Sequence, residues 1–533
     1  MADQAGTSDN YVLRALPLLA GYGDGEAIVH AGRRISYRQI TAMVMTMARA
    51  LAAHGVQPGS GVAVMSRNHP EEVALQLALH LIGCRTVWIA SYAPYPDQAS
   101  FAQLAKAEVL IYDTGTSRGG DLAVDAAAWP RPVLVLCLGA GGQGPNLLAE
   151  LDHSRPVDVG QAPSLAAGSP QSLFYSGGTT GRPKLIQHGQ GFYQALLAIA
   201  AYYRQVGEPP MRFLSGSSLS HVSGQLSTFL TLFEGGTFFI NAGFEPAQFL
   251  ATIEAERISS AFLTPPLLAR VVEQARQRPV DTSSLRYLNV GGAAASPALL
   301  ADAIKAFGPV VRIVYGSGEA PLITDLPFLD HDPEHPERLS SCGLPFAGTG
   351  LDIRDANGKR LPAGATGEVW LTGPLLMQGY WEQPGLTGQT MVGGWLRTGD
   401  VGYLDADGYL YLVDRLSDMI ITGSISANVY ARPVEDALAS HPQVLAAAVI
   451  GVPDETYGEA VHAFVVPAPG AAVTAGQLRA LVVAKLNDLY APKDVEFVSS
   501  LPMTMLDKVD KKALRARYLR HTAPALASEA GSK

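Results

Sequence analysis

The stretch SLFYSGGTTGRPKLIQH, residues 172–188, organises this chain of 533 residues. It begins as an apolar strand end and turns abruptly into small residues before reaching Lys184. Consecutive glycines let backbone N–H groups converge on an anion because no Cβ blocks the approach, while small hydroxyls add donors and the lysine adds charge. The stretch therefore predicts a polyphosphate-binding loop made of Ser176, Gly177, Gly178, Thr179, Thr180 and Gly181. It lacks the Gly-Lys-Ser/Thr ending of the Walker-type loop.

The length, net charge and cysteine content of the chain limit the classes of protein to which it can belong. A chain of 533 residues exceeds the usual size of one core, so we expect two or more domains. A net charge of −9 with 16% charged residues argues against a nucleic-acid-binding surface. We find no apolar run of membrane-spanning length and no secretory signal, which predicts a cytoplasmic protein without a membrane span. Cys84, Cys137 and Cys342 are too scattered for a disulfide framework or a metal cluster and are expected to be core thiols.

Short apolar runs alternate with helical patterns through the first half of the chain, which predicts an α/β fold with parallel pairing. We expect buried strands at 61–65, 86–90, 109–112 and 133–136, and helices at 42–54, with Thr41 as the cap, and from Pro70 onward. Turn-rich residues 343–414 predict a β-rich, barrel-like subdomain, and 444–498 predict a small α+β domain. The expected organisation is a large domain at 1–414, a hinge at 415–418, a small domain at 419–520 and a disordered tail at 521–533.

Residue for residue, the glycine-rich stretch resembles the signature loop of the adenylate-forming superfamily, which includes acyl-CoA synthetases, peptide-synthetase adenylation domains and firefly luciferase. It departs from the usual pattern at Gly177, where serine is common, and at Leu185, where glycine is common. The resemblance covers nearly the whole chain, with its motifs in the family's order. It implies a large N-terminal domain of layered α/β subdomains and a small, mobile C-terminal domain, with ATP, Mg²⁺ and coenzyme A as cofactors.

The resemblance also assigns the nucleotide site. In YLNVGGAAASP, residues 287–297, it places adenine against Gly291, Gly292 and Ala293. In VVRIVYGSGE, residues 310–319, it implies that Tyr315 stacks on the base and that Glu319 holds the magnesium ion, with Gly316 and Gly318 alongside. Gly318 stands where the family usually has threonine, so a hydroxyl near the metal and phosphates is missing.

Four further positions follow from the same resemblance. Asp400, in WLRTGD, corresponds to the carboxylate that binds the ribose hydroxyls, and Arg415 to an arginine that touches the nucleotide. Ser417 stands at the hinge, and Lys508, in LPMTMLDK, falls on the catalytic lysine. Ser417, a longer hairpin with Pro433 in place of an acid, and Asp507 in place of glycine depart from the pattern. These departures make the thiol-transfer step the less secure half of the reaction.

Small or neutral residues mark the expected acid pocket. His221 and Gly224, in SHVSG, resemble the motif whose histidine lines the floor of the acyl pocket. Together with Gly291 and Gly316 they favour a bulky, apolar carboxylic acid over an amino acid. The resemblance therefore implies an AMP-forming acid–CoA ligase, with Lys184, Glu319 and Lys508 as catalytic residues.

Several alternatives stay open. The enzyme is also consistent with forming an acyl-adenylate and passing it to an acyl-accepting partner protein, and a homodimer is open. A different class is an α/β-hydrolase that uses Ser117 in Gly115-Thr116-Ser117-Arg118-Gly119, although we expect a surface loop there because no helical pattern follows. A non-catalytic nucleotide-binding regulator is a third class. Histidines and acids at 330–337 suggest a metal site, but the intervening prolines forbid the helix that would align them.

Overall fold

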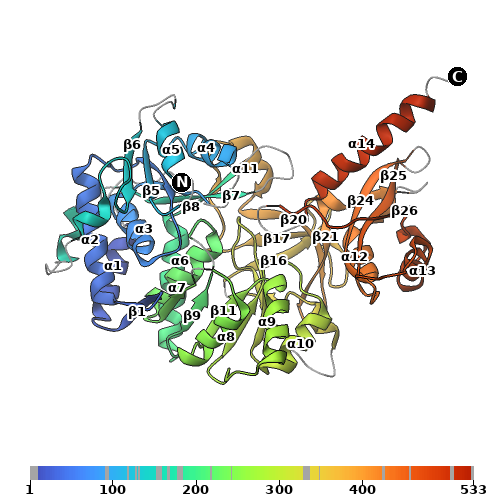
Figure 1. Cartoon of the computed structure of the whole chain (residues 1–533), viewed down its shortest axis with the longest axis horizontal. Helices are drawn as coiled ribbons and strands as arrows, with labels where there is room; N and C mark the ends of the chain where they lie inside the picture. Colours follow the sequence, from blue (N-terminus) through green and yellow to red (C-terminus); the bar gives the residue numbers. More distant parts are fainter. Residues whose placement is uncertain are drawn as a thin grey trace.

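The computed structural model describes residues 10–90, 95–116, 119–126, 129, 133–151, 159–164, 168–176, 184–216, 219–241, 243–327, 336–346, 348–422, 427–454, 458–504 and 509–529. A large body contains the N-terminal and middle parts of the chain, and a smaller lobe from the C-terminal part lies beside it (Figure 1). The last helix extends away from both (Figure 1).

The first large sheet carries the strands on either side of the glycine-rich stretch. Its order is β18 (Gly379–Tyr380), β8 (Lys184–Gly189), β7 (Gln171–Ser176), β4 (Arg85–Trp88), β3 (Gly61–Met65), β5 (Val109–Asp113) and β6 (Leu134–Leu138). The strands from β7 to β6 are parallel, whereas β8 and β18 are antiparallel to their neighbours. Every residue of β3 and β5 is buried, as expected for parallel strands covered on both faces.

The second large sheet has nine strands. Its order is β15 (Leu344–Pro345), β14 (Thr324–Leu326), β13 (Val311–Tyr315), β12 (Tyr287–Val290), β11 (Ser260–Leu263), β9 (Arg212–Ser215), β10 (Thr237–Ile240), β1 (Glu26–His30) and β2 (Arg33–Ser36). The strands from β13 to β1 are parallel, and the three short strands at the two edges are antiparallel. The predicted parallel α/β fold is therefore confirmed.

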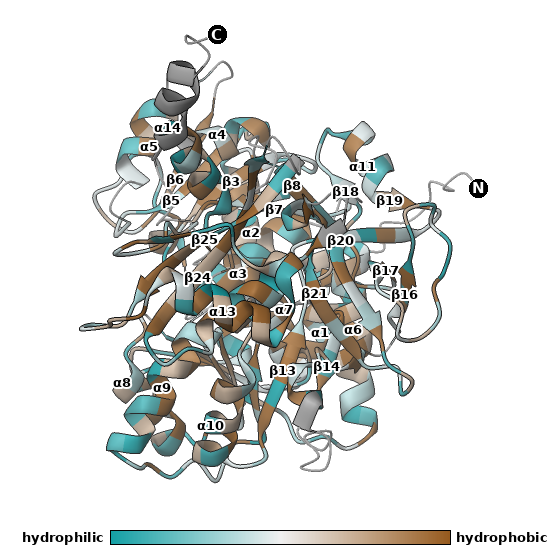
Figure 2. Ribbon diagram, turned by 90° about the vertical axis from the view of Figure 1, so that its right-hand side faces the viewer, coloured by the Kyte–Doolittle hydropathy of each residue, from teal (hydrophilic) through white to brown (hydrophobic). Residues whose placement is uncertain are grey.

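Helices form three layers around these two sheets. The middle layer buries side chains in one core between the sheets and consists of α1 (Val12–Gly21), α2 (Tyr37–Ala53), α3 (Pro70–Ile82), α6 (Gln190–Gln205) and α7 (Val222–Phe233). The outer face of the second sheet packs against α8 (Pro246–Ala255), α9 (Pro265–Gln277) and α10 (Pro297–Phe307). The outer face of the first sheet packs against α4 (Tyr95–Leu104) and α5 (Gly119–Ala126). Teal and brown alternate along α8 and α9, as expected for amphipathic surface helices (Figure 2).

Helix α2 begins earlier than the sequence predicts. Its N-cap is Ser36, whose hydroxyl accepts a hydrogen bond from Gln39 N at 3.2 Å in a capping box. The predicted cap Thr41 is wrong: it lies inside the helix, and its hydroxyl donates to the Tyr37 carbonyl at 2.9 Å. The error arose because Tyr37 and Ile40 extend the buried face of the helix upstream. Pro70, by contrast, opens α3 as predicted.

A third, antiparallel sheet closes the large body. Its order is β16 (Gly350–Arg354), β17 (Gly367–Thr372), β20 (Trp395–Leu404) and β19 (Met391–Val392), and β21 (Leu410–Arg415) also pairs with β20. Helix α11 (Pro384–Thr390) lies between β18 and β19 in the chain. The predicted β-rich subdomain is confirmed as this five-stranded sheet. Short 3₁₀ helices are η1 (Leu147–Glu150), η2 (Val159–Ser164), η4 (Pro336–Ser340), η5 (Leu416–Asp418) and η6 (Asp488–Tyr490).

The C-terminal lobe is a small α+β unit, as predicted. It contains the hairpin β22 (Ile420–Thr422) and β23 (Ala427–Val429), the sheet β24 (Val444–Asp454), β25 (Gly458–Pro467) and β26 (Asp494–Phe497), and the helices α12 (Ala431–Ala439), α13 (Ala475–Lys485) and α14 (Lys511–Glu529). The predicted hinge at 415–418 coincides with the end of β21 and with η5.

The predicted disordered tail at 521–533 stays a prediction. Helix α14 continues through Glu529, and residues 530–533 lie outside the described part of the chain.

Candidate active site

The predicted site residues come from all three sheets of the large body. Lys184 is the first residue of β8, Glu319 lies in the loop between β13 and β14, and Asp400 and Arg415 lie on β20 and β21. Ser176 ends β7 and pairs in register with Lys184. Lys508 and most of the predicted phosphate loop lie outside the described residues: Gly177, Gly178, Thr179, Thr180 and Gly181.

Strand β8 presents one face to the segment that carries Glu319. Residues two apart in a strand share a face, so Lys184, Ile186 and His188 lie on the same side. His188 Nε2 lies 2.8 Å from the Gly318 carbonyl oxygen, and the ring is fully buried. Burial lowers the pKa of His188 to about 4, so the ring is neutral near pH 7. Because a carbonyl only accepts, Nε2–H is the donor, and this bond fixes the backbone beside Glu319.

One phenol contacts both Lys184 and Glu319. The Tyr380 hydroxyl donates to Glu319 Oε1 at 2.8 Å, and Lys184 Nζ lies 4.9 Å from the centroid of the Tyr380 ring. Burial and the Glu319 carboxylate raise the pKa of Tyr380, so the hydroxyl stays protonated. Met377 N–H donates to the Glu319 carbonyl at 2.8 Å and holds its backbone. Two predicted catalytic residues from different sheets are thus joined through Tyr380.

Asp400 is surrounded by donors. The Tyr315 hydroxyl donates to Oδ2 at 2.5 Å, and Arg415 Nε lies 2.8 Å from Oδ1. The carboxylate is buried, and burial together with Asp400 raises the pKa of Tyr315. Asp400 is also the main cause of the raised pKa of Arg415, to which Glu319 contributes. The charge of Arg415 therefore acts on both Asp400 and Glu319, and the two halves of the site adjoin.

Three of the predicted glycines lie where backbone or side chains approach closely. A Cβ on Gly291 would lie 2.6 Å from the Val314 carbonyl oxygen, and one on Gly316 would lie 2.3 Å from the Pro321 carbonyl oxygen. A Cβ on Gly318 would lie 2.5 Å from Ile186 Cδ1. The space beside Gly318 that a threonine side chain would need is thus filled by an isoleucine from β8.

The other predicted residues fall into two groups. Gly292 and Ala293 are exposed in the loop after β12, and Gly292 has a φ of +82°, which favours glycine. His221 is the N-cap residue of α7, and Gly224 is buried in the first turn of that helix. Burial lowers the pKa of His221, which favours a neutral ring near pH 7. The contacts around Tyr380 and Asp400 join Lys184, Glu319, Tyr315 and Arg415, whereas His221 and Gly224 belong to the helical layer between the sheets.

This arrangement suits a nucleotide that carries phosphates and a hard cation. Lys184 and Arg415 supply positive charge, and Glu319 supplies a carboxylate of which only Oε1 is bonded to a described residue. Mg²⁺ is typically held by one or two carboxylates together with substrate phosphates, so the donor set fits. Elsewhere in the described residues, no three His, Cys, Asp or Glu side chains form a metal-binding group. Most of the acidic stretch at 330–337 lies outside the described residues.

The sequence interpretation gave no role to Tyr380, Ile186 or His188. His188 and Ile186 could have been found by counting alternate positions from Lys184 along β8. Tyr380 offered no such signal, because β18 reaches β8 from almost two hundred residues away in the chain. Its pairing with Ile186 appears only in the folded structure.

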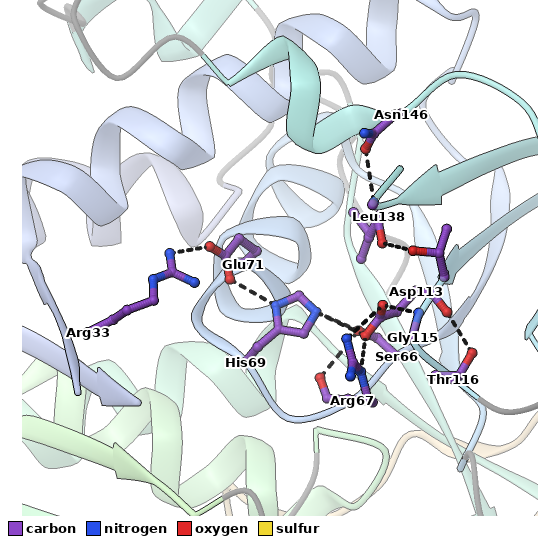
Figure 3. A network of polar contacts seen from close by, with 12 residues as sticks. Arg33, Ser66, Arg67, His69, Glu71, Asp113, Gly115, Thr116, Leu138 and Asn146 are labelled. Atoms are coloured by element: carbon purple, nitrogen blue, oxygen red, sulfur yellow. Dashed lines mark hydrogen bonds and ion pairs between the residues drawn. The ribbon is translucent and has the colours of Figure 1, made fainter. Parts of the chain in front are cut away.

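A second polar cluster bears on the hydrolase alternative (Figure 3). Ser66 Oγ lies 3.0 Å from His69 Nε2, and His69 Nδ1 lies 2.9 Å from Glu71 Oε2. The order of serine, histidine and acid matches a catalytic triad, but Ser66 is only 7% exposed. His69 Nε2 also lies 3.7 Å from Asp113, which binds Arg67. We interpret the cluster as an ion-pair network that fixes the loop between β3 and α3.

The predicted hydrolase serine, Ser117, lies outside the described residues. One expectation about its surroundings is wrong, because helix α5 begins at Gly119, directly after the loop that was expected to lack a helix. Leu122, Ala123 and Ala126 give this helix a buried face despite the two glycines at its start.

The sequence matches the profile of the AMP-binding enzyme family over residues 19–381 and that of the AMP-binding enzyme C-terminal domain over residues 433–508. The chain belongs to this family, which confirms the predicted adenylate-forming class, its two-part architecture and its identity as an enzyme. The hydrolase alternative finds no support in this membership.

Its relatives include CoA ligases and an amide bond synthetase. The chain is 34% identical to a medium/long-chain-fatty-acid–CoA ligase of Mycobacterium tuberculosis, covering 91% of this chain and 86% of that protein. It is 33% identical to a feruloyl-CoA synthase of an Amycolatopsis species, covering 92% and 96%. Among solved structures, the amide bond synthetase McbA from Marinactinospora thermotolerans has a TM-score of 0.83 and 38% identity, covering 95% and 100%. No helix in the described ranges has the length and apolarity needed to cross a bilayer.

Proposed function

We propose that this enzyme uses ATP to convert a carboxylic acid into an acyl-adenylate, releasing pyrophosphate, and then transfers the acyl group to the thiol of coenzyme A, releasing AMP. The observation that carries the proposal is a pair of neighbouring contact groups in an AMP-binding enzyme: Tyr380 contacts Lys184 and Glu319, and Asp400 pairs with Arg415, whose charge also acts on Glu319. The CoA ligases among its relatives support the second step.

The first step brings two anions together, because a carboxylate attacks the α-phosphorus of ATP. The protein must therefore supply positive charge and alignment rather than a covalent intermediate. Lys184 and Lys508 supply charge at the phosphates, and Asp400 accepts hydrogen bonds from the ribose hydroxyls. Glu319 would hold Mg²⁺, which neutralises phosphate charge when bound.

The second step requires the small domain to turn about the hinge at 415–418, which removes Lys508 and admits the thiol. In the structure, Asp418 lies 3.3 Å from Arg515 and 3.8 Å from Lys511, both on α14. The residue after Ser417 is thus tied to the C-terminal lobe, whereas Arg415 is tied to Asp400 of the large body. The Ser417 carbonyl also accepts a hydrogen bond from Arg515 at 3.4 Å, so the attachment changes from the large body to the lobe between Arg415 and Ser417, which suits a hinge there.

A second candidate function replaces coenzyme A with an amine or an acyl-accepting partner protein. The amide bond synthetase is 38% identical over its full length, which favours an amine as the acceptor. Ser417, Pro433 and Asp507 depart from the usual pattern near the thiol-transfer parts, which also favours this candidate. Both candidates share the adenylate-forming step and differ only in the acceptor.

We propose a bulky, apolar acid as the substrate. His221, neutral near pH 7 because burial lowers its pKa, and the small residues Gly224, Gly291 and Gly316 offer no charge to an amino acid's amine. The fatty acid and ferulate in the relatives' names are consistent with this class.

Pyrophosphate release across a panel of fatty, aromatic and polycyclic acids tests the first step, and mass spectrometry with coenzyme A or a set of amines identifies the product. We expect Lys184→Ala and Lys508→Ala to abolish release. Lys305→Ala, an exposed lysine on α10, is the matched control and should leave release unchanged. Release that is unaffected by both catalytic substitutions contradicts the proposed site. A thioester supports the first candidate, and an amide without thioester supports the second.

Residency in the cytoplasm, a homodimer and the hinge position stay predictions from the sequence. Size-exclusion chromatography with light scattering tests the dimer, and limited proteolysis near residues 415–418 tests the hinge.

A further inference from the structure

Lys184 and Glu319 carry opposite charges and contact the same side chain, the lysine at the ring face and the glutamate at the hydroxyl. In the proposed reaction the lysine must bind phosphate, and the glutamate must bind a cation. If the two side chains paired with each other, each would lose the charge it needs. Among the described residues no ion pair joins them; both contact Tyr380 instead.

The fold fixes the backbone of Tyr380. The residue is only 7% exposed, and its backbone N–H donates to the Thr387 hydroxyl at 2.9 Å. In β18 it pairs with Ile186, which lies on the same face of β8 as Lys184. The neighbouring backbone is held on both sides, by Gln378 N to Gln187 O at 2.8 Å and by Trp381 N to Leu185 O at 2.8 Å. The backbone of Tyr380 is therefore fixed relative to β8, and its buried ring is confined by the packing around it.

We propose that Tyr380 is a positioning residue that keeps Lys184 and Glu319 apart: its ring face receives the ammonium, and its hydroxyl orients the carboxylate. The inference rests on the proposed adenylate-forming function. Aromatic faces attract ammonium groups, so the ring holds Lys184 without neutralising its charge. The Tyr380 hydroxyl donates a hydrogen bond to Glu319 Oε1, so Oε2 remains available to bind a cation. Gly318 carries no hydroxyl, and Ile186 fills the space beside it, so the phenol is the donor that orients Glu319 from the described residues.

Two substitutions separate the two roles of Tyr380. Tyr380→Phe keeps the ring and removes the hydroxyl, so the affinity for Mn²⁺ in the presence of a non-hydrolysable ATP analogue should fall about tenfold or more, as expected for a lost hydrogen bond to a charged group. Electron paramagnetic resonance of free Mn²⁺ measures this affinity. The rate at which an amine-reactive reagent labels Lys184, read by mass spectrometry, should stay unchanged.

Tyr380→Ala removes the spacer as well, so Lys184 and Glu319 can pair. Labelling of Lys184 should slow about threefold or more, the effect expected of a partly formed surface ion pair. The Mn²⁺ affinity should fall further than in Tyr380→Phe. Adding Lys184→Met to Tyr380→Ala should then recover part of the Mn²⁺ affinity, because Glu319 is released. Loss of packing alone would give no such recovery.

Tyr22→Phe is the matched control, because the Tyr22 hydroxyl also donates one hydrogen bond, to the Phe233 carbonyl at 2.8 Å, outside the site. It should leave Mn²⁺ affinity and Lys184 labelling unchanged. Circular dichroism confirms that each variant is folded. Unchanged Mn²⁺ affinity in Tyr380→Phe, or no recovery in the double variant, overturns the inference. A wild-type enzyme that binds Mn²⁺ and the analogue but releases no pyrophosphate with any acid contradicts the proposed function instead.

Discussion

Replacing Gly318 with alanine tests how tightly β8 packs against the segment that carries Glu319. The new Cβ would lie 2.5 Å from Ile186 Cδ1, closer than carbon atoms approach without displacement. Ile186 is 1% exposed, so its Cδ1 methyl group has little free space into which it can move. Overpacking of this kind costs about 1–3 kcal/mol of unfolding free energy. We expect a value near the lower end, because the clash involves the outermost methyl group.

Ile186→Val removes that methyl group and makes room for the new Cβ. Alone, this change costs about 0.5–1.5 kcal/mol through lost packing. If the two residues meet as the structure shows, the double variant should be no less stable than Ile186→Val alone. The coupling energy would then be at least about 1 kcal/mol and favourable, well above the error of such cycles.

Urea denaturation followed by circular dichroism measures the four stabilities, and pyrophosphate release shows whether Glu319 keeps its place. Gly120→Ala is the control, because nothing lies within 4 Å of a Cβ at this exposed helical position. That change should not destabilise the protein. Strictly additive losses in the Gly318 and Ile186 cycle, or no loss at all in Gly318→Ala, would refute the packing argument.

Three other predictions follow from the described contacts. Asp400→Asn should raise the KM for ATP about tenfold, as expected for lost charge-assisted hydrogen bonds, whereas Asp352→Asn, which breaks an ion pair elsewhere in the same sheet, should not; steady-state kinetics decides. Burial lowers the pKa of His188 to about 4, so below pH ~6.5 the folded state binds fewer protons than the unfolded chain. The free energy of unfolding therefore falls as the pH drops from ~6.5 toward the folded-state pKa of about 4. The wild-type protein should lose unfolding free energy between pH ~7 and ~5, and His188→Gln should reduce that loss by about 2 kcal/mol in urea denaturation. The contribution of buried His80 to the loss should remain, and an unchanged dependence of the unfolding free energy on pH would contradict the prediction. Ser36→Ala should cost about 1 kcal/mol in the same assay, because it removes a capping box, and a loss below about 0.3 kcal/mol would contradict the role of the cap.

The sequence predicted the elements of the fold well where local signals agree. Strand β3 has the predicted limits, and α3 begins at Pro70 with two acids in its first turn. The start of α2 was placed too late, because the capping box that Ser36 forms with Gln39 was not used as a start signal. The buried Tyr37 extends the apolar face of the helix upstream of the predicted start.

The site was predictable in its parts but not in its connections. The sequence motifs identified Lys184, Glu319, Asp400 and Arg415, and the structure brings these four residues together. What joins them could not be predicted, because Tyr380 reaches Lys184 only through the pairing of two strands far apart in the chain. The roles of the four residues in catalysis stay predictions until the variants are measured.

One wrong expectation has a clear physical reason. Helix α5 forms where the sequence suggested a loop. Its glycines carry a weak helix propensity, but tertiary packing of Leu122 and its neighbours outweighs it.

The donors around Asp400 have a consequence for the choice of sugar. Tyr315 and Arg415 each engage one oxygen of the carboxylate, and each oxygen has a second lone pair that can accept a further hydrogen bond. A ribose offers two adjacent hydroxyl groups to these two acceptors, whereas a 2′-deoxyribose offers one. The arrangement therefore favours ribonucleotides over deoxyribonucleotides.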